Sequence, residues 1–208
     1  MLRSAILAAV QGRYGIPTDD GLLTPTVING FIDRAVKKVE LAHDWPWLET
    51  TETIATANGT SVYSVASNYV RTISVRIEEA APMTRFSIVE ADHWGIANIG
   101  TPKAYALIGR QIRLIPTPNA TLSVLHRYVR TETALGSDSA EPLCPEPWIE
   151  AVITWTGVLC ADRTSNMEQH GARKVEFADI IGDLVRRSNE DADTTGGGAP
   201  APVAPAKA

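Results

Sequence analysis

Basic side chains gather in residues 101–131, a stretch of the chain that contains no Asp or Glu. They are Lys103, Arg110, Arg113, Arg127 and Arg130. On neighbouring strands they would form a basic face that attracts phosphate groups through a local, salt-sensitive field, as in a nucleic-acid-binding module. The alternative is a solvated sheet face whose cations pair with carboxylates of adjacent strands or of another subunit. We favour this alternative because only Tyr105 and Tyr128 are available to stack on bases.

Two tryptophans flank a proline in the sequence HDWPWLET at residues 43–50. If Trp45 and Trp47 were both exposed and coplanar, they would suit a carbohydrate-binding module. Pro46 disfavours helical geometry for the residue before it, so the two rings cannot share one helix face. A large aromatic side chain that follows an apolar helical stripe covers the end of that helix. We therefore predict that this stretch packs at a corner of the fold, and we keep the carbohydrate reading as an alternative.

Residues with catalytic or metal-binding chemistry are scattered. The histidines are His43, His93, His126 and His170, and no His, Cys and carboxylate cluster has metal-ligand spacing. The nucleophile-elbow, P-loop and dinucleotide-binding motifs do not occur in the sequence. We expect no catalytic residue, no cofactor and no metal site, and we interpret the chain as a protein that is not an enzyme.

Composition and charge limit the classes of protein to which the chain can belong. The chain has 208 residues, of which 44% are apolar and 21% charged, as in an ordinary globular protein. Its net charge of −5 argues against a general polyanion binder. Cys144 and Cys160 are not in a C-x-x-C pair, which indicates no disulfide framework and synthesis in a reducing compartment. No apolar stretch approaches the length that spans a bilayer, so we expect no membrane partner.

The helical parts of the fold lie on either side of the basic stretch. The first residues are expected to form a short amphipathic helix. A long helix is predicted over 24–45, with Thr24 as N-cap, Pro25 at the first helical position and an end before Pro46. Its apolar stripe is Ile28, Phe31, Ile32, Ala35, Val36 and Val39.

A β-rich region is predicted between these helical parts. Period-two alternation and abundant Val, Ile, Thr and Tyr predict strands throughout 51–130. Asn58-Gly59 predicts a hairpin between the first two strands, and Gly109 a turn between two later ones. Residues 87–98 predict a short helix within the region.

The C-terminal part is predicted to be a helical pair followed by an arm. The pair covers 146–188: its first helix is led by Pro147 and apolar on most sides, and its second opens at a capping box from Ser165 to Glu168. Residues 190–208 are rich in Ala, Pro and Gly and cannot bury apolar surface, so we expect an extended arm there. The fold class is α+β, with residues 1–189 as one domain.

The order of these motifs resembles the head–tail adaptor proteins of tailed bacteriophages, also called connector or head-completion proteins. The resemblance covers roughly residues 24–185. It rests on a helix ending in DWPWL, the strands TETIATANGTSVYSV and YVRTISVRI, the motif from Gly100 to Tyr105, and IRLIPTPNA with LHRYVR. A proline-led helix rich in Trp and small residues completes the order.

The resemblance implies a structural protein of the virion neck, made in the host cytoplasm. It implies a ring, typically of twelve copies, that joins the portal protein to the tail or tail-completion proteins and lets genomic DNA pass through its lumen without sequence-specific binding. It also implies a C-terminal segment that reaches the portal. The residues expected to bind the portal are Glu190, Asp191, Pro200, Pro202, Val203 and Pro205. Arg110 and Arg113 are hypothesised to face the lumen or an adjacent subunit.

Overall fold

The computed structural model describes residues 1–18, 20–94, 98–132 and 134–195, with side chains described up to residue 190. Contacts between residues divide the chain into two units. The helical unit consists of residues 1–46 and the chain from 135 onward, and the β unit consists of residues 47–134. We expected one domain over residues 1–189 with a β-rich insertion at 51–130, and the β unit holds that insertion. The fold is mixed α+β, as predicted.

The helical unit is built around one apolar helix. Helix α4 (Glu146–Arg163) packs against α1 (Arg3–Tyr14), α2 (Pro25–Glu40) and α5 (Met167–Thr195). Its buried residues lie on all sides, as the consecutive buried residues Val152, Ile153 and Thr154 show, and as the all-round apolar pattern predicts. Burial raises the pKa of the Cys160 thiol to about 11, so this thiol stays protonated at neutral pH.

Helix α2 begins as the sequence predicts and ends sooner. The Thr24 side chain accepts a hydrogen bond from the Val27 backbone N–H, and Pro25 occupies the first turn. The helix ends at Glu40, five residues before the predicted end at residue 45. The Trp45 indole N–H donates to the Val39 carbonyl at 2.7 Å, and this carbonyl also accepts from the Ala42 N–H at 3.1 Å, so the indole adds a second donor at the helix end.

Trp45 is a core residue. Its side chain is 0% exposed and meets the rings of His43 and Trp148 edge-on. The short 3₁₀ turn η1 (Pro46–Leu48) follows, and Trp47 is only half-buried. The packing interpretation of HDWPWLET is therefore confirmed for Trp45. The alternative of a carbohydrate-binding platform formed by Trp45 and Trp47 is wrong, because the Trp45 ring has no exposed face.

Helix α5 starts later and ends later than predicted. Ser165 has φ 57° and cannot act as an extended N-cap; instead the Asn166 side chain accepts from the Gln169 N–H at 3.2 Å. The helix continues to Thr195, so the predicted arm start is wrong and Glu190 and Asp191 lie in the helix. No Gly or Pro interrupts the chain between Gly182 and Gly196, and Arg186 pairs with Asp183 and Glu190 one turn away on either side.

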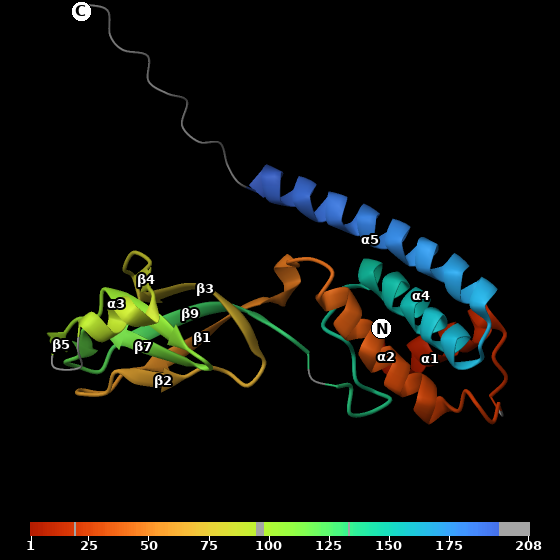
Figure 1. Cartoon of the computed structure of the whole chain (residues 1–208), viewed down its shortest axis with the longest axis horizontal. Coiled ribbons are helices and arrows are strands. Elements are labelled where there is room, and N and C mark those ends of the chain that lie inside the picture. Colours follow the sequence, from red (N-terminus) through yellow and green to blue (C-terminus); the bar gives the residue numbers. More distant parts are fainter. Residues whose placement is uncertain (19, 95–97, 133, 196–208) are drawn as a thin grey trace, which may run out of the picture. The chain divides into compact units, whose positions relative to one another are not determined.

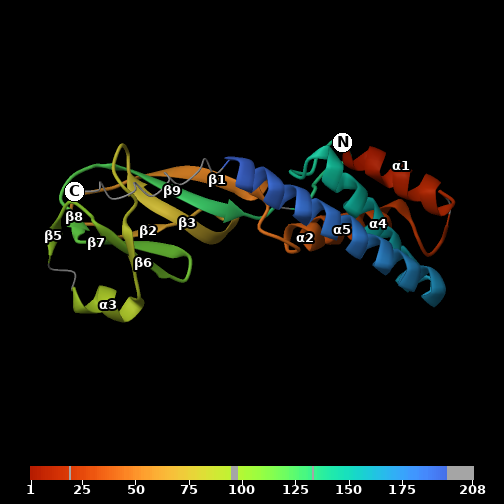
Figure 2. The same ribbon diagram turned by 90° about the horizontal axis from the view of Figure 1, so that it is seen from above.

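Helix α5 is much longer than its partner. It has 29 residues against 18 in α4, and the two are joined by a tight turn, so its C-terminal part runs past the first turn of α4. Figures 1 and 2 show this overhang along the blue helix. The helix is anchored through Phe177, Leu184 and Ser188, all of which are buried.

The β unit contains two main sheets. Strands β1 (Glu49–Ala55), β9 (Ser123–Arg130) and β3 (Tyr69–Ile77) form an antiparallel sheet in that order. The second sheet has the order β2 (Val62–Ser64), β7 (Gln111–Ile115), β6 (Ala104–Ile108) and β4 (Thr84–Phe86), with β4 parallel to β6. Two-residue strands β5 (Ile99–Gly100) and β8 (Thr117–Pro118) pair separately.

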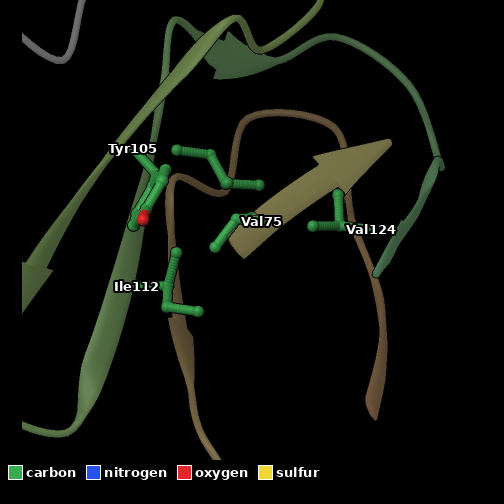
Figure 3. Packing of buried hydrophobic residues seen from close by; sticks show 5 residues of the cluster. Val75, Tyr105, Ile112 and Val124 are labelled. Atoms are coloured by element: carbon green, nitrogen blue, oxygen red, sulfur yellow. The ribbon is translucent and has the colours of Figure 1, made fainter. Parts of the chain in front are cut away.

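The core of the β unit draws on both sheets. Its buried cluster is Val75, Tyr105, Ile112, Leu114 and Val124. Figure 3 shows side chains from β3, β6, β7 and β9 converging on one interior. A second cluster lies under the short helix α3 (Ile88–His93), where Ala91 faces Ala104, Ala106 and Ile115 of the sheet. Because these residues are mostly alanines, α3 can lie close to the strands.

In the β unit both predicted glycine turns are confirmed, and the predicted pairing of the first two strands is wrong. Gly109 turns the chain between β6 and β7 with φ 60°, as predicted. Gly59 also has a turn conformation, with φ 78°, but β1 pairs with β9 while β2 pairs with β7. The predicted hairpin is therefore wrong, because this turn carries the chain from one sheet to the other. Helix α3 begins where predicted, capped by Ser87 and Glu90 in a reciprocal box, but it ends at His93, short of the predicted end at residue 98; residues 95–97 of that prediction lie outside the described residues.

Candidate assembly surfaces

A buried polar network crosses the three-stranded sheet. His126 of β9 is 0% exposed, its Nδ1 lies 2.8 Å from Glu52 Oε1 of β1, and its Nε2 lies 2.9 Å from Thr72 Oγ1 of β3. Thr72 also bonds to the Tyr69 hydroxyl, and the Tyr69 and Tyr128 rings lie against the imidazole. The order hydroxyl, imidazole, carboxylate is that of a hydrolase triad. Here the imidazole is closed off from any substrate, and the network instead links the three strands.

Replacing His126 by alanine should lower the free energy of unfolding by about 2–4 kcal/mol, because the change opens a cavity and removes partners from Glu52 and Thr72. Urea unfolding followed by circular dichroism measures this loss. His93→Ala is the matched control: His93 is exposed on α3, so its removal should change stability by less than about 0.5 kcal/mol. Equal effects of the two substitutions would contradict a structural role for the network.

The basic stretch is largely engaged within the chain. Arg113 is buried and its Nη1 lies 2.6 Å from Asp92 Oδ1 on α3, while Arg127 pairs with Glu49 on the adjacent strand. Arg110 is exposed and donates to the carbonyls of Ala66 and Ser67. The pair between Arg127 and Glu49 is as expected from the alternative in which the cations pair with carboxylates of adjacent strands. Of the two arginines hypothesised to face the lumen or another subunit, only Arg110 presents an exposed side chain.

These two arginines are expected to differ in their contribution to stability. Arg113→Ala should cost about 1–3 kcal/mol, because it removes a buried stem and its charge-assisted hydrogen bond. Arg110→Ala should cost less than about 0.5 kcal/mol, since the side chain is exposed. Thermal unfolding of both variants measures the difference. A smaller loss for Arg113→Ala than for Arg110→Ala would contradict this assignment.

An apolar cavity of about 640 Å³ opens in the β unit. Its lining residues are Thr84, Phe86, Trp94, Gly100, Thr101, Lys103, Ala104, Ile115 and Pro116. The Phe86 and Trp94 rings lie 6.3 Å apart at 35° and form one aromatic wall. Trp94 is 51% exposed and Ile99 of β5 is 62% exposed, so apolar surface also faces solvent here. Large exposed apolar surfaces mark interaction sites in soluble proteins.

The residues expected to bind the portal fall at the C-terminal end. Glu190 lies on the exposed side of α5 and pairs with Arg186 at 3.5 Å, and the Asp191 backbone is helical. The other expected residues, Pro200, Pro202, Val203 and Pro205, lie outside the described residues. In the part of the chain with described side chains, no group of His, Cys, Asp and Glu is arranged to hold a metal ion.

Two features were not predicted from the sequence, namely the aromatic cavity and the His126 network. The aromatic cavity joins residues of β4, β5, β6 and β7 with Trp94, the residue after α3, and no local pattern relates them. The His126 network did leave a signal: Val124, His126 and Tyr128 alternate along β9, so period two places the histidine on the inward face.

The comparison with protein families decides the class of this chain. The model of the SU10 adaptor protein family matches residues 1–205, nearly the whole chain. The chain belongs to this family. No curated protein matches it closely. The adaptor is thus a structural protein of a bacteriophage virion, and the head–tail adaptor resemblance read from the order of its motifs is confirmed.

The family covers both units of the adaptor. The match extends from the first helix through the β unit and α5 into the Pro-rich segment, so neither unit is foreign to the family. An adaptor protein acts through contacts with portal and tail proteins. Across the helices that the structure describes, none has the length and apolarity to cross a membrane.

Proposed function

We propose that this adaptor forms a ring in the virion neck, between the portal and the tail or tail-completion proteins, and that genomic DNA passes through its lumen. The observation that carries the proposal is the family match over residues 1–205. Twelve copies are proposed by resemblance to head–tail adaptors. The mechanism is assembly: the adaptor contributes surfaces and no catalytic group.

The C-terminal end is the proposed portal-binding element. The overhang of α5 places Glu190 and Asp191 beyond the partner helix, and the Pro-rich residues Pro200, Pro202, Val203 and Pro205 follow. A segment without its own core can order on a partner, and several such segments on one ring gain affinity through effective concentration. We therefore assign the first contact with the portal to this end of the chain.

The charge pattern supports passage of DNA without binding. The net charge is −5, and Arg113 and Arg127 are paired with carboxylates of the same chain. A protein of negative net charge repels the phosphate backbone, so its lumen is expected to hold DNA weakly, which permits rapid transit. The same pairing weighs against the alternative of a nucleic-acid-binding module using residues 101–131. Binding of the purified adaptor to DNA with a steep salt dependence would favour that alternative.

Negative-stain microscopy of the adaptor mixed with its portal tests the ring. Rings seated on the portal are expected for the full chain, and loss of seating is expected when the chain is cut after Thr195. Particles that stay monomeric with and without portal would overturn the proposal. Arg110→Glu tests the lumen or inter-subunit role: fewer rings, or DNA lost from assembled particles, would support it, and unchanged assembly and DNA retention would remove it.

A further inference from the structure

Strand β1 forms one edge of the three-stranded sheet, and half of its backbone groups point away from that sheet. The Thr56 N–H donates to the Leu122 carbonyl at 2.9 Å, so in the register of β1 and β9 the even-numbered residues of β1 turn their backbone groups toward β9. The outward N–H and C=O groups therefore belong to the odd-numbered residues Glu49, Thr51, Thr53 and Ala55. Among the residues that the structure describes, none forms a hydrogen bond with these outward groups.

This edge lacks the features that keep a further strand from adding to a sheet. Soluble proteins protect their sheet edges with proline, lysine, bulges or very short strands. Strand β1 runs for seven residues in regular register with β9 and contains no proline, glycine or lysine. Its two charged side chains are held toward the sheet, because Glu52 lies against His126 and Glu49 pairs with Arg127. The edge is therefore open to an extended segment that adds as a further strand.

The sheet has a second edge that suits the same contact in a neighbouring copy of the chain. A closed ring needs two different surfaces on each copy, one for the neighbour ahead and one for the neighbour behind. Strands β1 and β3 lie on opposite sides of β9, and both run antiparallel to it, so they point the same way. Neighbours in a ring of many copies differ by a small rotation, so β1 of one copy meets β3 of the next as a parallel pair. The segment of β3 that takes part is 69–74, since Arg76 is bridged to Pro82 farther along the strand.

Charge favours this pairing over the two pairings between like edges. Strand β1 contains Glu49 and Glu52 and no cation, whereas β3 contains Arg71 and Arg76 and no carboxylate. Placing β1 beside β1, or β3 beside β3, brings like charges together, and placing β1 beside β3 brings opposite charges together. Both carboxylates already have partners on β9, so charge selects the neighbouring strand and the backbone hydrogen bonds hold it.

We infer that the outer edge of β1 pairs with residues 69–74 of β3 in the neighbouring copy, which joins the three-stranded sheets of adjacent subunits. The inference rests on the proposed ring and names the contact between its subunits. The outward N–H groups of Thr51 and Thr53, in the middle of β1, then donate to carbonyls of the neighbour. In the free chain these two residues are exposed, so their N–H groups bond to water. The inward N–H groups of Glu52 and Ile54 keep their bonds to β9 in both states.

Hydrogen exchange of the full chain, alone and in rings seated on the portal, tests this contact. Mass spectrometry with fragmentation of the labelled peptides resolves single amides. The amides of Thr51 and Thr53 should exchange about tenfold or more slowly in the rings, because each gains a hydrogen bond, while those of Glu52 and Ile54 should slow much less. Unchanged exchange of Thr51 and Thr53 in well-formed rings would overturn the inference and leave the ring itself standing. An unaltered chain that forms no rings would overturn both.

Proline substitution removes one outward donor and spares the bonds to β9. Thr53→Pro should lower the yield of rings about tenfold or more, because an edge strand tolerates proline at an outward N–H but can no longer donate there. The matched control is Val62→Pro on β2, an edge strand of the second sheet. The Ser61 carbonyl accepts from the Leu114 N–H, so the Val62 N–H also points away from its sheet, and this variant should form rings as the unaltered chain does.

Circular dichroism establishes that both proline variants fold. Thr53→Lys is the second variant at the same position: it keeps the backbone donor and places an edge-protecting charge there, so it should also lower the yield of rings. Equal yields from the Thr53 variants and Val62→Pro would overturn the inference.

Cross-linking identifies which strand lies beside β1. Thr53 and Ser74 lie on the same face of the sheet by their registers with β9. A short bismaleimide should join copies carrying Thr53→Cys to copies carrying Ser74→Cys in mixed rings. The native Cys144 and Cys160 are buried, and the unaltered chain measures their background. Linkage of Thr53→Cys copies only to one another, to the portal or to a tail protein would overturn the inference.

Discussion

Replacing Trp45 by alanine is expected to lower the free energy of unfolding of the adaptor by about 3–5 kcal/mol, the range for loss of a large buried aromatic side chain. The indole is 0% exposed, so its removal leaves a void at the point where α2 ends. Trp148 of α4 then loses an edge-on contact at a centroid distance of 5.6 Å. The Val39 carbonyl also loses its indole donor.

Two further substitutions separate these contributions. Trp45→Phe keeps most of the ring volume and removes the indole N–H, so it should cost about 1–3 kcal/mol, from a smaller void and the loss of one buried hydrogen bond to the Val39 carbonyl, which keeps the Ala42 N–H as a donor. Trp94→Ala removes a tryptophan that is 51% exposed and should cost much less than Trp45→Ala. Urea unfolding measures all three. Similar losses for Trp45→Ala and Trp94→Ala would contradict the packing role assigned to Trp45.

Trp45 also shows what local sequence reveals. Pro46 and the apolar stripe of α2 were sufficient to predict a packed aromatic at the helix end, and Thr24 and Pro25 were sufficient to predict the helix start. These signals act over a few residues, because backbone sterics and capping hydrogen bonds are local. The partner Trp148 lies more than a hundred positions away, so no local pattern places it against Trp45.

The errors arise where tertiary pairing overrides a local signal. Asn58-Gly59 does form a turn, yet the strands on either side of it belong to different sheets. The partners of His126 at Glu52 and Thr72 are 74 and 54 positions away. The acidic and polar composition after Asn189 predicts an extended arm from residue 190, whereas α5 continues to Thr195. Intrahelical pairs of Arg186 and the absence of Gly or Pro before Gly196 instead allow α5 to continue.

For the candidate surfaces, too, charge and composition are visible in the sequence, whereas tertiary partners are not. Arg110 and Arg113 were identified by charge alone, and charge does not reveal that Arg113 is buried against Asp92. The aromatic cavity could not be found from sequence, because its wall joins β4 to the end of α3. The Pro-rich segment was visible from composition. Its proposed partner, the portal, comes from the family resemblance.

Gly157→Ala is expected to destabilise the helical unit by about 1–3 kcal/mol, although alanine is the better helix former. A Cβ at residue 157 of α4 would lie 2.3 Å from Tyr14 Cε2 and 2.4 Å from Cζ. The Tyr14 ring is held in place by the Arg173 guanidinium, 3.9 Å from the ring centroid, and Arg173 in turn donates to the Gly157 carbonyl at 2.6 Å. This interlock joins α1, α4 and α5, so displacement of the ring loosens all three helices.

Gly182→Ala should have the opposite sign. Gly182 lies inside α5 and a Cβ there would meet no atom within 4 Å, so the substitution should stabilise the chain by about 0.5–1 kcal/mol through reduced backbone entropy of the unfolded state. Thermal unfolding of the two variants tests the pair. Adding Tyr14→Ala to Gly157→Ala should cost less than the sum of the two single changes, because the clash disappears with the ring. Stabilisation by Gly157→Ala, or strict additivity in this double variant, would contradict the interlock.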